Sequence, residues 1–167
     1  MSVARETLAP TDHSHPHLYE TMRGEAMTTG NENAAYEIRP GVPDVATYRM
    51  LRGATGLGAK SVEGSAIGLP NSWYCVTVTR HADTVGMGRI VGDGGCFLQI
   101  VDICVLPEHQ GQGLGKLIMA ELTAELERRA PKGTYVSLMA DGDARHLYAK
   151  FGFVDPAPAS VGMARLL

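Results

Sequence analysis

Three glycines at alternating positions separate an apolar run from a helical pattern in the middle of the chain. They are Gly111, Gly113 and Gly115, and they follow Pro107, which cannot donate a backbone hydrogen bond to a strand ladder. Glycine allows positive φ angles and lets a ligand approach the backbone closely. The first amides of a helix lack partners within the helix, and the helix dipole makes that end positive. This strand–loop–helix junction is therefore expected to bind an anion, and a phosphate-rich ligand above all.

The spacing of the glycines excludes the two common nucleotide-binding loops. A dinucleotide-binding GxGxxG loop needs its third glycine one position after Gly115, where the chain has Lys116. A P-loop, GxxxxGK[ST], would need glycine in place of Gln110 and serine or threonine in place of Leu117. The remaining alternative is a glycine-rich turn without a ligand. It is disfavoured because each glycine at a helix start costs about 1 kcal/mol relative to alanine.

The elements around this junction predict an α/β (α+β) fold. Helical spacing predicts helices over residues 44–53, 113–130 and 143–151. The segment between residues 53 and 68 has room for one more short helix. Consecutive hairpins followed by a strand–helix–strand unit predict a mixed, mostly antiparallel central sheet with one parallel strand pair and helices on both faces. Runs of β-branched, aromatic and apolar residues predict the strands Tyr36–Arg39, Trp73–Arg80, Thr84–Val91, Cys96–Val105, Thr134–Ala140 and Val161–Leu166.

Length and composition fit one cytoplasmic domain. The chain has 167 residues, of which 44% are hydrophobic and 20% charged. A net charge of -3 argues against a nucleic-acid partner. No apolar run reaches the ~20 residues of a membrane span, and the N-terminus lacks the order of a signal peptide. Cys75, Cys96 and Cys104 form no CxxC pair and are interpreted as reduced thiols.

The first 34 residues are polar and without a clear period. We interpret them as an extension, either flexible or ordered by a partner, in front of a single domain of residues 35–167. His13, His15 and His17 alternate in this extension, but a metal site would need further ligands on the same face. A solvated tail is the preferred interpretation, so no metal is expected.

Two motifs resemble those of the GCN5-related N-acetyltransferases (GNAT). Gln110-x-x-Gly113-x-Gly115, after a strand that ends in Val-x-Pro, is similar to the family motif Q/R-x-x-G-x-G/A. The segment Leu147–Phe153 (LYAKFGF) is similar to the family's LYxKxGF. The order of strands and helices also agrees from about Tyr36 to Leu166. The resemblance implies the GNAT fold, in which the two parallel strands splay apart, and acetyl-CoA as the acyl donor.

The resemblance also implies a role for individual residues at the donor site. The loop amides would bind the pyrophosphate of acetyl-CoA. The preceding strand would pair with the pantetheine arm, and one of its amides would polarise the acetyl carbonyl. Tyr148 matches the family's general acid, since a phenol with an ordinary pKa near ~10 is protonated at neutral pH. The alternative for Tyr148 is an aromatic residue packed at a helix end. The expected cofactor-binding residues are Ile103, Cys104, Val105, Gln110, Gly111, Gln112, Gly113, Leu114, Gly115, Lys116, Asp141 and Tyr148.

The acceptor amine must lose a proton before or during its attack, and the family has no fixed residue for this step. Asp102, which precedes the acetyl-binding stretch, is the first candidate for a general base. It is equally suited to a structural role that holds a helix or a loop. Cys104 could indicate an acyl-enzyme, but its apolar strand favours a packed thiol and therefore direct attack.

The expected function is acetyl transfer from acetyl-CoA to a primary amine of a small molecule. The alternatives are acetylation of a protein or peptide amine, and a sensor module that binds acetyl-CoA without catalysis. The resemblance places the acceptor site at about Leu51–Tyr74 and Pro156–Met163. It also allows a homodimer through the last strand or the sheet edges.

Overall fold

The computed structural model describes residues 36–166. The predicted N-terminal extension, with His13, His15 and His17, lies outside the described residues. The described part contains one sheet, four α-helices and a 3-10 turn. In chain order these elements are β1 (Glu37–Pro40), α2 (Val45–Ala54), α3 (Val62–Gly68), β2 (Tyr74–Arg80), β3 (Asp83–Gly92), β4 (Phe97–Val105), η1 (Pro107–His109), α4 (Leu114–Arg129), β5 (Tyr135–Leu138) and α5 (Ala144–Ala149).

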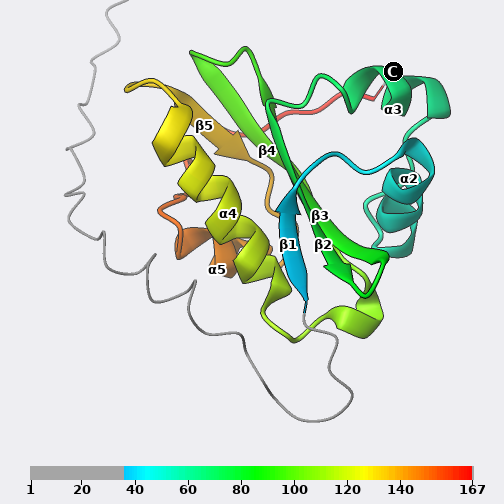
Figure 1. The fold of residues 1–167 in the computed structure, drawn as a ribbon. Helices are drawn as coiled ribbons and strands as arrows, with labels where there is room; N and C mark the ends of the chain where they lie inside the picture. Colours follow the sequence, from blue (N-terminus) through cyan, green and yellow to red (C-terminus); the bar gives the residue numbers. More distant parts are fainter. Residues whose placement is uncertain (1–35, 167) are drawn as a thin grey trace, which may run out of the picture. The chain divides into compact units, whose positions relative to one another are not determined.

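The five strands form a single sheet in the order β1-β2-β3-β4-β5 (Figure 1). The first four strands are antiparallel neighbours, and β4 and β5 run parallel. A parallel pair cannot be joined by a tight turn, so α4 makes the crossover between them. The predicted mixed, mostly antiparallel sheet is confirmed.

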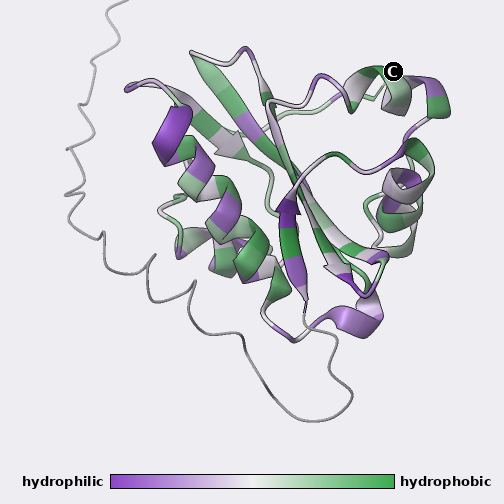
Figure 2. Cartoon of the chain, viewed as in Figure 1, coloured by the Kyte–Doolittle hydropathy of each residue, from purple (hydrophilic) through white to green (hydrophobic). Residues whose placement is uncertain are grey.

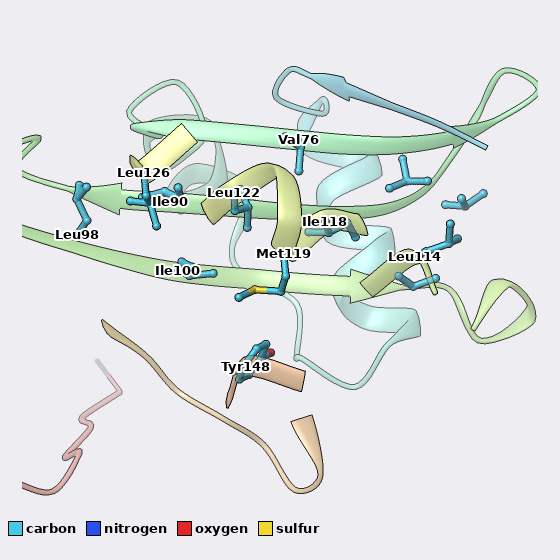
Figure 3. Packing of buried hydrophobic residues seen from close by; sticks show 13 residues of the cluster. Val76, Ile90, Leu98, Ile100, Leu114, Ile118, Met119, Leu122, Leu126 and Tyr148 are labelled. Carbon is cyan, nitrogen blue, oxygen red and sulfur yellow. The ribbon is translucent and has the colours of Figure 1, made fainter. Parts of the chain in front are cut away.

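Helix α4 covers one face of the sheet, and its apolar side forms the main core. Ile118, Met119 and Leu122 are fully buried there against residues of β2, β3 and β4, among them Val76 and Ile90 (Figure 3). Hydrophobic and hydrophilic residues alternate along this helix, as expected of a helix with one buried side (Figure 2). A second, smaller core joins α2 to β3 and β4 on the other face.

Two glycines of β3 let α4 lie close to the sheet. A Cβ atom built on Gly88 would lie 2.5 Å from Cγ2 of Ile118 and 3.0 Å from Cδ1 of Leu122. A Cβ atom on Gly86 would lie 2.9 Å from the carbonyl oxygen of Cys104. The lack of a side chain therefore lets α4 approach β3 at Gly88 and lets β4 approach β3 at Gly86.

The pairing of β4 with β5 ends before β4 itself ends. Their pairing runs from Phe97 with Tyr135 to Ile100 with Leu138, and β4 then continues to Val105 without a parallel partner. The two parallel strands thus splay apart, as the resemblance to the GNAT family implied.

A β-bulge interrupts β4 where the splayed part begins. The register with β3 shifts so that Asp102 and Ile103 together face Gly88, and Asp102 has a φ of 59°. The bulge therefore lies directly before the strand residues that were expected to contact the acetyl group.

The predicted strand Val161–Leu166 is wrong, because the described residues after α5, up to Leu166, form no helix or strand. The apolar alternation of this segment would need a sheet face to cover. Instead, Val161, Met163 and Leu166 are 70%, 93% and 89% exposed. The fifth strand is also shorter than predicted. Among the described residues, none of the helices is both long and apolar enough to cross a membrane.

Candidate active site

A cavity of about 410 Å³ lies at the C-terminal end of β4. Its walls come from β4, the glycine-rich loop, the first turn of α4, α5 and the turn after α2. Nine predicted cofactor-binding residues line it: Ile103, Cys104, Val105, Gln110, Gly111, Gly113, Leu114, Gly115 and Tyr148. Five further lining residues were not among the predicted cofactor-binding residues: Thr55, Leu57, His109, Ala144 and Leu147.

Four of the predicted site residues do not line the cavity. Gln112 and Lys116 belong to the loop and to α4 but are not among its lining residues. Asp141 lies in the loop between β5 and α5, near enough for its charge to act on Tyr148. Asp102 belongs to the bulge and turns its side chain into the protein.

The glycine-rich loop leaves backbone amides accessible at the cavity. Gly111 and Gly113 have φ angles of 74° and 78°, which favour glycine. Gly113 is the N-cap of α4, and no side chain caps this helix, so its first amides remain available to a ligand. Nε2 of Gln110 donates to the carbonyl oxygen of Val105 at 2.9 Å and ties the loop to the end of β4. These features suit the anion site that the glycine spacing predicts, and binding of an anion there stays a prediction.

Tyr148 brings a buried phenol to the same cavity. The residue is 9% exposed and packs in the main core with Met119 (Figure 3). Burial raises the pKa of its hydroxyl, and the nearby charge of Asp141 raises that pKa further. Among the described residues, none accepts a hydrogen bond from this hydroxyl. Tyr148 is therefore protonated at neutral pH and free to donate to a ligand.

Cys104 lines the cavity with a thiol that is poorly suited to nucleophilic attack. Burial raises the pKa of Cys104 to about 11. The thiolate is the reactive form of cysteine, so this thiol is largely unreactive at neutral pH. The geometry thus gives no support to an acyl-enzyme on Cys104.

Asp102 lies at the centre of a buried charged cluster under α2. Its Oδ1 pairs with Nη1 of Arg52, and its Oδ2 lies 3.3 Å from Nη1 of Arg89. The hydroxyl of Tyr48 donates to Oδ2 at 3.1 Å. The side chain of Asp102 is 7% exposed, so both oxygens are engaged inside the protein. Of the two roles left open for Asp102, these contacts favour the structural one.

Comparison with known proteins agrees with this geometry. Residues 71–155 match the model of the acetyltransferase (GNAT) domain. A protein of unknown function from meticillin-resistant Staphylococcus aureus, described as a probable acetyltransferase, is 39% identical. It covers 79% of this chain and 99% of its own, with a TM-score of 0.76. The chain belongs to the GNAT family.

Two curated N-acetyltransferases are similar over shorter stretches. The uncharacterized N-acetyltransferase ycf52 of Pyropia yezoensis is 33% identical over 101 residues, which are 58% of this chain and 57% of the relative. The chain thus spans little more than half the length of that relative. The ribosomal protein bS18-alanine N-acetyltransferase of Haemophilus influenzae is 33% identical over 54 residues, which are 32% of this chain and 37% of that protein.

The five lining residues that were missed differ in whether the sequence held a signal for them. Leu147 belongs to the LYxKxGF-like segment, and His109 directly precedes the GNAT loop motif. His109 is also held in place, since its Nδ1 lies 2.9 Å from the hydroxyl of Tyr36. Thr55 and Leu57 come from a turn about fifty residues earlier, inside the segment Leu51–Tyr74 where the resemblance placed the acceptor site, and no motif singled out these two residues.

Proposed function

We propose that this protein transfers the acetyl group of acetyl-CoA to a primary amine of a small molecule by direct attack. One observation carries the proposal. The open amides of the glycine loop and the unengaged hydroxyl of Tyr148 line the same cavity. The loop would hold the phosphates of the donor, and Tyr148 would receive the leaving group. Membership of the GNAT family supports acetyl transfer as the reaction class.

The donor would lie along the splayed part of β4. Gly111, Gly113 and the first amides of α4 would hold the pyrophosphate. Beyond Ile100, β4 has no parallel partner, so its backbone groups can pair with the pantetheine arm. An amide within Ile103–Val105 would donate to the acetyl oxygen as negative charge develops there. No metal is needed in this scheme.

The reaction would proceed in one transfer without an acyl-enzyme. The amine nitrogen attacks the thioester carbonyl carbon, and a C–N bond forms as the carbonyl oxygen becomes an oxyanion. The C–S bond then breaks, and Tyr148 gives its proton to the departing thiolate. The ammonium proton leaves through water, and the tyrosinate regains a proton from solvent. Because the oxygens of Asp102 are already occupied, we assign no side chain as the base.

The substitution Tyr148→Phe tests the acid role. General acid catalysis contributes about 10²–10⁴-fold, so we expect kcat to fall by about 10²-fold or more. The dissociation constant of acetyl-CoA, measured by calorimetry, should stay within about twofold because the phosphate site is intact. Tyr135→Phe is the matched control, since Tyr135 is 55% exposed and does not line the cavity. Unchanged turnover in Tyr148→Phe would remove the assignment.

A screen of acceptors decides between small molecules and peptides. Release of free CoA thiol would be followed with a panel of small amines and with peptides that begin with alanine. The peptides are included because one relative is a ribosomal-protein alanine acetyltransferase. Turnover with peptides alone would replace our proposed acceptor class. Tight binding of acetyl-CoA without turnover on any acceptor would favour a sensor.

A further inference from the structure

The turn after α2 forms one wall of the cavity. Thr55 and Leu57 line the cavity, and Leu57 also packs on the small core that contains Cys104. Gly56 and Gly58 have φ angles of 80° and 73°, so the turn adopts a conformation that few other residues accept. A turn of this kind needs fixed contacts if it is to present Leu57 in one place.

Arg52 supplies three of these contacts. Its Nη2 donates to the carbonyl oxygen of Leu57 at 2.6 Å, and its Nε donates to that of Gly58 at 2.8 Å. Its own carbonyl oxygen accepts from the amide of Leu57 at 3.1 Å. The guanidinium is thus wrapped by the turn, with 10% of the side chain exposed.

Asp102 connects this guanidinium to β4. The carboxylate pairs with Nη1, the guanidinium nitrogen of Arg52 that the turn does not use. Asp102 occupies the bulge, directly before Ile103 and Cys104, which line the cavity. One continuous path therefore runs from the bulge through Asp102 and Arg52 to the backbone of Leu57.

A simpler interpretation is that Arg52 only caps the C-terminus of α2, as basic residues often do. A cap needs no carboxylate on another element. Burying a guanidinium and a carboxylate carries a large desolvation cost, so such a pair is weak evidence for stability alone. A buried pair that fixes the register of two elements is the better-attested use.

We propose that Arg52 and Asp102 are positioning residues that clamp the turn of residues 55–58 against β4. The clamp makes Leu57 a fixed wall beside Cys104, at the acyl end of the donor. The location of the acyl end rests on the proposed function, whereas the clamp itself does not.

Arg52→Lys tests the clamp, because lysine keeps the charge opposite Asp102 but cannot reach both turn carbonyls at once. Hydrogen exchange of the peptide that contains the Leu57 amide is measured without ligand. We expect exchange to accelerate by about tenfold or more as the turn opens locally. Arg89→Lys is the matched control, since Arg89 also pairs with Asp102 but makes no hydrogen bond to the turn. Its Leu57 peptide should exchange within about twofold of the wild type.

The affinity for acetyl-CoA, compared with that for CoA, tests whether the clamp fixes a wall at the acyl end. A displaced wall at the acyl end should weaken acetyl-CoA by about fivefold and CoA by less than about twofold. Gly58→Ala provides a second variant, because its Cβ would meet no atom within 4 Å and only the φ of 73° is strained. Gly58→Ala should also accelerate exchange of the Leu57 peptide and weaken acetyl-CoA more than CoA, although it changes no hydrogen-bonding side chain. It replaces Arg52→Lys as the test if that variant does not fold.

Three outcomes would overturn the clamp. The first is unchanged exchange and affinity in both Arg52→Lys and Gly58→Ala, which would leave Arg52 as a helix cap. The second is an equal effect of Arg89→Lys on the Leu57 peptide, which would mean that the cluster stabilises the whole layer. The third is an equal loss of CoA and acetyl-CoA affinity, which would remove the wall from the acyl end. If the wild type binds neither ligand, the proposed function fails, and exchange in the free protein still decides the clamp.

Discussion

At the scale of single residues, burial shifts the pKa values of Tyr148 and Cys104 in the same direction, but the chemical consequence differs. It raises the pKa of both side chains. For the phenol this preserves the proton that the proposed acid role requires. For the thiol it removes the charged form that an acyl-enzyme needs. Because burial raises the pKa of Tyr148 above that of an ordinary phenol, the side chain stays protonated at neutral pH.

Alkylation should distinguish the exposed cysteine from the two buried ones, because burial raises the pKa of a thiol. Iodoacetamide at about pH 8 should modify Cys96 alone, because Cys96 is exposed while burial raises the pKa of Cys75 to about 12 and of Cys104 to about 11. Intact mass should show a single adduct, and denatured protein should show three. A second adduct that forms at Cys104 as fast as the first would contradict the buried state of that thiol.

At the scale of elements, glycine decides how α4 meets the sheet. Gly88→Ala would place a methyl group 2.5 Å from Cγ2 of fully buried Ile118. Overpacking of this kind costs about 1–3 kcal/mol, and urea unfolding should show the loss. Gly53→Ala is the control, because its Cβ would meet no atom within 4 Å inside α2. Alanine at that position should be neutral or stabilise by up to about 1 kcal/mol. Equal free energies of unfolding for the two variants would mean that α4 is not closely packed against β3 at Gly88.

The two glycines of the loop motif should respond differently to alanine. Gly113 has a φ of 78°, so Gly113→Ala strains the N-terminus of α4 by about 1–2 kcal/mol. We expect CoA binding, measured by calorimetry, to weaken by about tenfold as the first amides shift. Gly115 has no positive φ, and its Cβ would lie 3.6 Å from Leu147, an ordinary contact. Gly115→Ala should bind within about twofold of the wild type, and an equal loss in both variants would contradict this division of roles.

At the scale of the whole molecule, residues 36–167 form one compact unit, and the described residues that line the cavity all belong to it. A chain that begins at Tyr36 should therefore fold and bind acetyl-CoA within about threefold of the full chain. Thermal unfolding with and without acetyl-CoA, together with calorimetry, measures both. A loss of more than about tenfold in affinity would show that residues before Tyr36 complete the site. The homodimer stays a prediction that sedimentation of the full chain can test.

The sequence by itself determined the parts of the site that local chemistry controls. The positive φ angles of Gly111 and Gly113 follow from local sequence, and the two motifs brought the loop and Tyr148 to one cavity. The binding and catalytic roles of these residues stay predictions. Periodicity also placed β4 and α4, because one buried face is visible in a single stretch of chain.

Only the tertiary structure decided what depends on register between distant segments. The bulge at Asp102 selects which face receives its carboxylate, and its partner Arg52 lies fifty positions away. The same pairing brings Leu57 to the cavity. The predicted last strand failed for the same reason, since alternation in Val161–Leu166 cannot specify whether a sheet edge is there to receive it. Local patterns fix backbone conformation, whereas packing fixes which side chains meet.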